Sequence, residues 1–306
     1  MSERHVLAWK RYLDKFNKCC LMESWKTFKK KIEKSQVGHK ADLYARLIIW
    51  KISAPITYLL VRTPITPNQI TVFQEIIGAI GAFCLAFKDI KYSLLGVILL
   101  QIGYIFDCVD GEVARYKGLS SVRGVYLDLI GHQFVIPMYL FFVGVGVYLR
   151  TNHLEAIILS FLSAVFVLRT DLYAMLSVVN TMLGKSENPN YNYKVLLKQF
   201  PDFRKVSDTV FKPRKGWKWV IRKKFSYPDS MNLLSIAVIA ECIFPCFSIF
   251  GYEIVPTYVF VLIFGTVIPL GRILSYIKNF KNYNTEKLFL KIVESAKKVE
   301  IKSQDE

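Results

Sequence analysis

The sequence is poor in acidic residues and has no cysteine pattern typical of a metal site. It contains 24 aspartates and glutamates against 41 lysines and arginines, which leaves a net charge of +17. The six cysteines follow no zinc-binding spacing, and Cys242 and Cys246, one helical turn apart, have no histidine near them. We therefore predict free thiols that pack as small apolar side chains, rather than a zinc domain or a disulfide framework.

We find neither a secretory signal nor the pattern of a second, soluble domain in the sequence. Residues 1–40 are charged and lack the apolar core of a signal peptide. No internal repeat and no soluble enzyme motif is visible along the chain. Because 53% of the residues are hydrophobic, we expect one membrane domain to carry the function.

Six apolar segments are mostly long enough to cross a bilayer, whose core is spanned by ~20 helical residues. The shorter ones continue into polar ends, which we expect to line a cavity rather than to face lipid. Before them, apolar residues recur with helical period over residues 41–62. The predicted fold class is an all-α membrane protein with six transmembrane helices preceded by an interfacial amphipathic helix. The six segments are residues 71–87, 94–106, 125–149, 154–168 with an extension to 183, 231–250 and 254–277.

Two prolines mark the boundary between the interfacial helix and the first membrane helix. Pro64 and Pro67 exclude a continuous helix through this part of the chain. Thr66 has a side-chain oxygen that suits an N-cap, and the proline after it suits the first helical turn. We therefore expect the first membrane helix to begin at this point.

The distribution of basic residues predicts how the protein is oriented in the membrane. One side collects all but four of the lysines and arginines if it holds the N-terminus, residues 107–124, residues 184–230 and the C-terminus. By the positive-inside rule this side is cytoplasmic. We predict a multi-pass membrane protein whose active site faces the cytoplasm. Its parts are a basic cytosolic or membrane-surface segment (1–40), a membrane domain (41–280) that includes the basic cytosolic loop 184–230, and a polar C-terminal tail (281–306).

Cations alternate with aromatic residues at positions 26–31 and 212–224. Anionic lipid headgroups attract such clusters by about 1 kcal/mol per charge, although the positive-inside rule alone explains the charges equally well. We expect membrane lipids as partners and no nucleic acid, because the clusters flank spanning helices instead of forming a separate domain.

Two pairs of polar residues stand at the edges of long apolar segments. Asp107 and Asp110 lie one helical turn apart and share one helix face. Asp128 and His132 repeat this arrangement in the next segment. Carboxylates are costly at membrane depth and usually mark a functional site. Hard oxygen ligands suit Mg²⁺ or Mn²⁺, so we predict that these four residues form a divalent metal site.

Small residues and one arginine accompany the two pairs. Gly111, Ala114 and Gly124 leave room for a ligand close to the backbone. Arg115 can neutralise a phosphate group. A diphosphate bridged by divalent metals is the ligand that fits this set of residues.

The string from Asp107 to His132 resembles the signature of the CDP-alcohol phosphotransferase (CDP-alcohol phosphatidyltransferase) family, which reads Asp-x2-Asp-Gly-x2-Ala-Arg-x8-Gly-x3-Asp-x3-Asp. Seven of the eight fixed positions match, and His132 stands where the family has its fourth aspartate. The resemblance extends upstream to residues 41–46 and 62–71 and covers about residues 41–280. A motif with this many fixed positions in a membrane context is far more specific than a lone glycine-rich loop.

The resemblance implies a reaction and a role for each motif residue. An acceptor hydroxyl would attack the β-phosphorus of a CDP-alcohol, such as CDP-diacylglycerol, forming a phosphodiester in phospholipid synthesis and releasing CMP. The family's fourth aspartate helps to hold the metals and is its proposed base, which makes His132 and Asp128 the expected catalytic residues. The resemblance also implies a CDP-alcohol donor, a polar or lipid alcohol as acceptor, and a homodimer. By family position, the metal ligands are Asp107, Asp110, Asp128 and His132, and the CDP contacts are Gly111, Ala114, Arg115 and Gly124.

His132 is the position on which the prediction of an active enzyme depends. A neutral imidazole binds transition metals and titrates near neutral pH, so it suits both a metal ligand and a general base. Its lack of negative charge favours a single-metal site, or Mn²⁺ over Mg²⁺. The alternative is a degenerate site in a pseudoenzyme that binds CDP or lipid. Because the other seven motif positions are intact, we favour an active transferase.

The sequence leaves the substrates open. Transfer of a CDP-linked polar headgroup to a lipid acceptor is the alternative to a CDP-linked lipid donor. Arg169, inside the fourth predicted helix, is our candidate for binding an anionic acceptor group, although a structural arginine fits the position equally well. Residues 62–71 resemble the branch of the family that uses inositol phosphate or similar polar acceptors.

Overall fold

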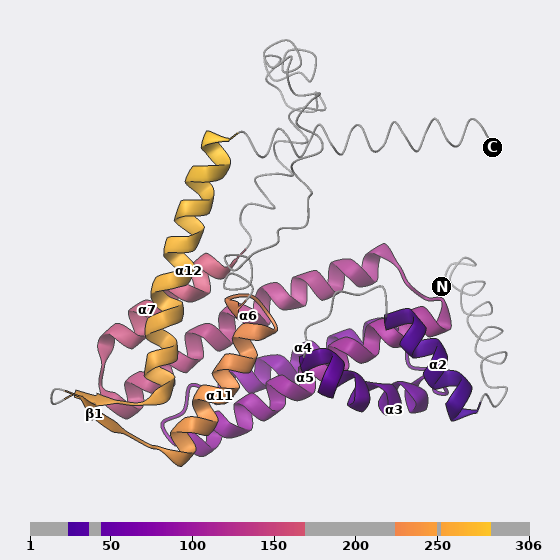
Figure 1. Ribbon diagram of the computed structural model, residues 1–306, viewed down its shortest axis with the longest axis horizontal. Helices are drawn as coiled ribbons and strands as arrows, with labels where there is room; N and C mark the ends of the chain where they lie inside the picture. Colours follow the sequence, from indigo (N-terminus) through magenta and orange to yellow (C-terminus); the bar gives the residue numbers. More distant parts are fainter. Residues whose placement is uncertain (1–23, 37–43, 169–223, 250–251, 283–306) are drawn as a thin grey trace, which may run out of the picture.

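The computed structural model describes residues 24–36, 44–168, 224–249 and 252–282, and the predictions for Arg169, for most of the 184–230 loop and for most of the 281–306 tail fall outside them. Within these ranges the protein is a helical bundle with one small β-hairpin (Figure 1). The elements are α2 (Trp25–Gln36), the π-helical turn η1 (Ala45–Ile49), α3 (Trp50–Leu60), α4 (Pro67–Cys84), α5 (Ile90–Lys117), α6 (Val122–Thr151), α7 (Leu154–Val167), α11 (Asp229–Ile243), β1 (Phe247–Ile249), β2 (Tyr252–Ile254) and α12 (Pro256–Lys281).

Each of the six apolar segments predicted from the sequence contains a helix. Within the described ranges, three of these helices, α5, α6 and α12, are long and apolar enough to cross a membrane. The shorter helix α7 is also apolar, but it has only 14 residues in the described part of the chain. The helical, membrane-spanning class is therefore supported by three helices, and the number of six spans stays a prediction.

The segment between α11 and α12 is a β-hairpin and not the continuous helix predicted for residues 231–250. The helix α11 ends at Ile243, and β1 and β2 pair antiparallel with Ser248 opposite Glu253. Pro245 explains the difference, because proline lacks a backbone N–H and disfavours helical conformation in the residue before it. The prediction of a continuous helix over residues 231–250 is therefore wrong after Ile243, while the described part of the chain remains predominantly helical.

The start of α4 is fixed by a capping box and by a buried lysine. Thr66 accepts a hydrogen bond from the backbone N–H of Gln69, and the Gln69 side chain accepts one from the backbone N–H of Thr66. The predicted cap at Thr66 is confirmed. Lys117, only 7% exposed, donates from Nζ to the carbonyl oxygens of Thr63 and Ile65 at 2.7 and 2.8 Å. The linker between α3 and α4 is thereby joined to the last turn of α5.

The predicted interfacial helix turns its polar side toward the protein. Ser53 and Thr57 on α3 donate hydrogen bonds of 2.8 and 2.6 Å to the two carboxylate oxygens of Glu112, which is 1% exposed. Ile49 packs into the core, and four other large apolar side chains of η1 and α3 point outward. They are Leu47, Ile48, Ile52 and Leu59, and all four are exposed.

The helix α4 packs against both α5 and α6, so its side chains lie next to the motif residues of both helices. Near the far end of α4 the backbones of α4 and α5 touch, because a Cβ atom at Gly81 would lie 2.8 Å from the carbonyl oxygen of Gly96. At the other end, Phe28 of α2 is fully buried and packs with Val109 and Val113 of α5. Figure 1 shows α2 and α3 at the end of the bundle opposite the hairpin.

Candidate metal and nucleotide site

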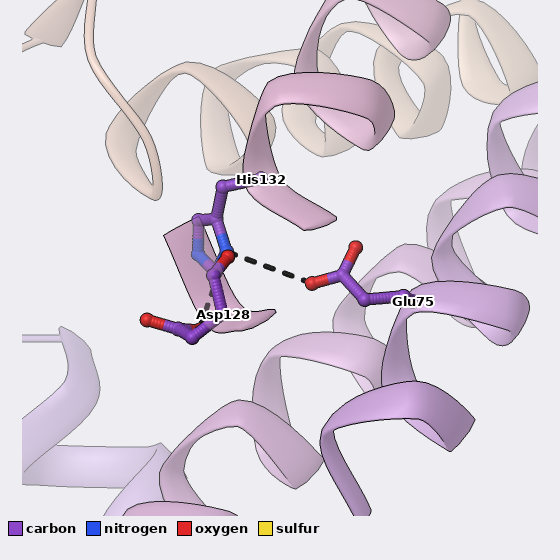
Figure 2. Close-up of side chains that lie close together, drawn as sticks. All are labelled: Glu75, Asp128 and His132. Atoms are coloured by element: carbon purple, nitrogen blue, oxygen red, sulfur yellow. Dashed lines mark hydrogen bonds and ion pairs between the residues drawn. The ribbon is translucent and has the colours of Figure 1, made fainter. Parts of the chain in front are cut away.

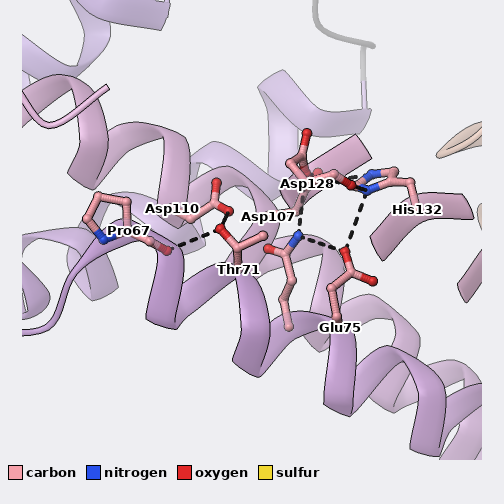
Figure 3. A network of polar contacts seen from close by, with 8 residues as sticks. Pro67, Thr71, Glu75, Asp107, Asp110, Asp128 and His132 are labelled. Carbon is pink, nitrogen blue, oxygen red and sulfur yellow. Dashed lines mark hydrogen bonds and ion pairs between the residues drawn. The ribbon is translucent and has the colours of Figure 1, made fainter. Parts of the chain in front are cut away.

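The motif residues of α5 and α6 come together beside α4 (Figure 3). Asp107 and Asp110 belong to α5, and Asp128 and His132 belong to α6. His132 Nε2 lies 3.8 Å from Asp107 Oδ1, and His132 Nδ1 lies 3.5 Å from Asp128 Oδ1. The two pairs that the sequence placed on separate helix faces thus face one another in the structure.

Two polar residues of α4 hold the acids of α5. The Thr71 hydroxyl lies 2.5 Å from Asp110 Oδ2 and 3.1 Å from the carbonyl oxygen of Pro67. Gln74 Nε2 donates to Asp107 Oδ1 at 3.2 Å. Both α4 side chains are buried, at 3% and 4% exposure. Since hydrogen bonds to a carboxylate restrict its rotation, α4 fixes the orientation of both aspartates.

A fourth carboxylate that we did not predict reaches the site from α4. Glu75 Oε1 lies 3.6 Å from His132 Nδ1 (Figure 2). It also lies 3.4 Å from Gln74 Nε2. A Cβ atom at residue 131 would collide with the Glu75 carboxyl group, so Gly131 leaves the space that this side chain occupies. A signal was present in the sequence, since an acid inside an apolar segment usually marks a functional site.

The chemistry of these donor groups suits a divalent cation. Ligand atoms of Glu75, Asp128 and His132 all lie within 4.8 Å of one another. Two buried side-chain oxygens, Gln74 Oε1 and Asp128 Oδ1, have no hydrogen-bond partner in the described part of the chain. No lysine or arginine in that part pairs with the carboxylates of Glu75, Asp107 or Asp128. His132 is the one basic side chain beside all three carboxylates in the described part of the chain, and a single imidazole cannot balance three negative charges, so a divalent cation would neutralise the remainder.

The backbone determines which nitrogen of His132 is available. His132 Nδ1 lies 3.0 Å from the carbonyl oxygen of Asp128. A carbonyl oxygen can only accept, so this contact places the proton of a neutral imidazole on Nδ1 and the lone pair on Nε2. The ring of Tyr227 meets the imidazole edge to face at 4.6 Å and limits its rotation. In the neutral imidazole, Nε2 therefore carries the ring's only lone pair that can bind a metal or a proton, and this atom faces Asp107.

The residues expected to contact CDP lie near the ends of α5 and α6 that face each other. A Cβ atom at Gly111 would come within 3.0 Å of Arg115 Nη1, so this glycine lets the guanidinium group lie close to the backbone. A Cβ atom at Gly124 would lie 3.2 Å from Asn68 Oδ1, which adds the first turn of α4 to this region. Ala114 is half-buried in the last turns of α5, one residue before the exposed Arg115.

Two other polar residues within the motif, Glu112 and Cys108, contact other parts of the protein and not the metal site. Glu112 binds the hydroxyl groups of α3, so it does not supply an oxygen ligand to the site. Cys108 is partly buried and packs against the main hydrophobic core, as expected for a small apolar side chain.

A small cavity of about 30 Å³ adjoins His132. Its polar wall consists of Gln74, Glu75, His132 and the tyrosines 104, 139 and 227, and apolar side chains and two glycines complete it. A space of this size holds a few water-sized groups, such as a hydroxyl and the atoms next to it.

Comparisons with known proteins agree with the motif. The family model described as CDP-alcohol phosphatidyltransferase matches residues 64–195, a range that contains every motif residue. The predicted resemblance is confirmed over this range, and the matched family consists of transferases.

The chain is similar to a bifunctional IPC transferase and DIPP synthase of Aquifex aeolicus, 38% identical over 85 residues, which is 28% of this chain and 19% of the relative. A protein of the same description from Archaeoglobus fulgidus is 34% identical over 103 residues, 34% of this chain and 20% of the relative. The chain thus spans about a fifth of the length of these curated relatives.

Proposed function

From the match of residues 64–195 to the CDP-alcohol phosphatidyltransferase family model, we propose that the protein is an integral membrane phosphotransferase that uses a CDP-alcohol. An acceptor hydroxyl attacks the β-phosphorus of the donor, a phosphodiester forms, and CMP leaves. The observation that carries the proposal is the meeting of the family motif's aspartates with His132 between two helices long enough to span a membrane. The pseudoenzyme is the alternative, and the measurement below separates the two.

We propose that Asp107, Asp110 and Asp128 hold a divalent metal, with His132 as a further ligand or as the base. A bound Mg²⁺ or Mn²⁺ would neutralise the diphosphate and the leaving CMP. Asp128 Oδ1 is buried without a hydrogen bond, and no lysine or arginine within the described ranges pairs with Asp107 or Asp128, which supports this assignment. Arg115 and the small residues Gly111, Ala114 and Gly124 are proposed to contact the CDP moiety.

His132 is suited to take the proton of the acceptor hydroxyl. Its Nδ1 proton is held by the Asp128 carbonyl group, so Nε2 is the atom that accepts. The cavity beside the imidazole is where the acceptor hydroxyl would lie, and Tyr227 borders both. The cavity is small and its wall is mostly apolar, so it would hold the hydroxyl group and the atoms next to it. The proposal of a polar acceptor alcohol rests on the resemblance of residues 62–71.

The proposed orientation places the site on the cytoplasmic side. The site lies in the C-terminal half of α5, which is the half beside α2 and α3 (Figure 1). The lysines 26, 29, 30 and 31 of α2 are exposed at this end of the bundle. Basic residues at one end support that end being cytoplasmic and in contact with anionic lipids. The homodimer and the anionic-acceptor role of Arg169 remain proposals from the sequence.

The decisive experiment measures CMP release by the purified protein from a panel of CDP-alcohols, with acceptors, in Mg²⁺, in Mn²⁺ and in EDTA. We expect metal-dependent CMP release with at least one donor. Donors labelled separately in the nucleotide-linked lipid and in the nucleotide-linked headgroup identify which group is transferred. If no donor releases CMP while a fluorescent CDP analogue still binds, the pseudoenzyme is the correct description.

A further inference from the structure

We infer that Glu75 of α4 is the fourth carboxylate of the metal site, in place of the aspartate that the family has at position 132. This inference rests on the proposed function, because it concerns the same metal site. Family position does not suggest it, since Glu75 lies 32 residues before the first motif aspartate. It depends on the way α4 packs between the two helices that carry the motif.

The position of Glu75 is built by several side chains. Gln74 Nε2 lies 3.2 Å from Asp107 Oδ1 and 3.4 Å from Glu75 Oε1, so one amide group orients both carboxylates. Glu75 is 19% exposed in its side chain and has no lysine or arginine partner among the residues described. Its one basic neighbour in these ranges, His132, is shared with Asp107 and Asp128, so the three carboxylates keep a net negative charge that suits a cation.

Gly131 makes this position possible. Any side chain at residue 131 would begin inside the volume of the Glu75 carboxyl group. Gly131 directly precedes His132, so the turn of α6 that lacks the family's carboxylate is also the turn that admits a carboxylate from α4. The missing carboxylate at position 132 and the carboxylate supplied by Glu75 therefore occur at the same turn of α6.

The number of available lone pairs explains why a site with histidine at position 132 needs another oxygen ligand. An aspartate has two oxygens, so one can bind a metal while the other accepts a proton. The imidazole of His132 has one available lone pair, on Nε2, because Nδ1 faces the Asp128 carbonyl group. His132 cannot hold a metal and take a proton at the same time through that one atom. Glu75 supplies the oxygen ligand, which leaves Nε2 of His132 free to act as the base.

The test measures Mn²⁺ binding to the full-length protein in detergent by electron paramagnetic resonance, without substrate. Glu75→Gln keeps the shape of the side chain and removes its charge, and we expect the Mn²⁺ affinity to fall at least ~10-fold. Glu155→Gln is the matched control, because Glu155 is a half-exposed glutamate at the start of α7. The control is expected to bind Mn²⁺ like the wild type. Equal affinities of Glu75→Gln and the control overturn the inference.

A double variant tests the replacement itself. His132→Asp combined with Glu75→Gln restores the family's four aspartates, so we expect its Mn²⁺ affinity to return to within about threefold of the wild type. If the double variant binds no better than Glu75→Gln alone, Glu75 does not replace the missing aspartate. Gly131→Ala offers a second route if Glu75→Gln fails to fold, and it is expected to weaken Mn²⁺ binding by displacing the Glu75 carboxyl group. Unchanged Mn²⁺ affinity in folded Gly131→Ala contradicts the inference.

These measurements separate the two proposals. A wild-type protein that binds Mn²⁺ through Glu75 but releases no CMP from any donor refutes the proposed activity and supports the metal assignment. A wild-type protein that releases CMP while Glu75→Gln keeps its Mn²⁺ affinity supports the activity and refutes the assignment.

Discussion

Replacing Thr71 by valine tests how far catalysis depends on the orientation of Asp110. The Thr71 hydroxyl lies 2.5 Å from Asp110 Oδ2 and is almost completely buried. Valine has nearly the same shape, so Thr71→Val removes this hydrogen bond with little change in packing. The carboxylate then loses the donor that aligns it.

The expected size of the effect follows from the kind of bond. A hydrogen bond to a charged group contributes about 1.5–3 kcal/mol, and about 1.4 kcal/mol corresponds to a factor of ten in rate. We therefore expect Thr71→Val to lower kcat/KM for CMP release by about 10- to 100-fold. The same range is measured when partners of metal ligands are removed, ~10- to 100-fold in metal affinity or activity. The concentration of Mg²⁺ needed for half-maximal activity should rise in parallel.

Thr266→Val is the matched control. The Thr266 hydroxyl donates to the backbone of its own helix, to the Leu262 carbonyl oxygen at 2.8 Å, and Thr266 is exposed on α12. It therefore loses a hydroxyl and a hydrogen bond to backbone, as Thr71→Val does, but touches no carboxylate. CMP release is assayed for both variants over a Mg²⁺ titration, with the melting temperature as a check on folding. If the two folded variants have the same kcat/KM, Asp110 does not depend on Thr71 and the metal assignment of Asp110 loses its support.

Three further predictions concern the motif and the orientation of the protein. Asp107→Asn or Asp110→Asn should abolish CMP release, because each removes a charge from the metal site, and near-normal turnover of folded protein would refute that role. His132→Ala should lower turnover at least ~10²-fold, the lower end for a positioned base, while binding of a CDP analogue through Arg115 stays measurable; wild-type turnover of this variant means that the base lies elsewhere. A cysteine introduced at position 215 should react with a membrane-impermeant maleimide only after the membrane is opened, and reaction in intact cells contradicts the predicted topology.

The sequence was sufficient to locate the motif because helical spacing is local. Asp107 with Asp110, and Asp128 with His132, share helix faces whatever surrounds them, and the N-cap at Thr66 depends only on its neighbours. Which helix lies between the two pairs is a property of the tertiary structure. Spacing alone did not show that the face of α4 bearing Gln74 and Glu75 is the one that meets them.

The hairpin between α11 and α12 was missed for a related reason. Residues 247–254 are largely apolar, and the prediction of membrane helices relied on apolar length. Pro245 gave a local signal against a continuous helix, but hydropathy over a window as long as a membrane span outweighed it. Strand pairing between Ser248 and Glu253 became evident only from the backbone.

The contacts of Lys117 and Glu112 join the motif helix α5 to the segment that precedes the family match. The family match begins at residue 64, yet Lys117 donates to the Thr63 carbonyl group, and Glu112 is bound by Ser53 and Thr57. A truncation at residue 64 would remove both hydroxyl donors of the buried Glu112 carboxylate, and each hydrogen bond to a charged group contributes about 1.5–3 kcal/mol. Expression vectors and chimeras with relatives should therefore place the N-terminal boundary before η1, so that α3 is inherited together with the motif helix.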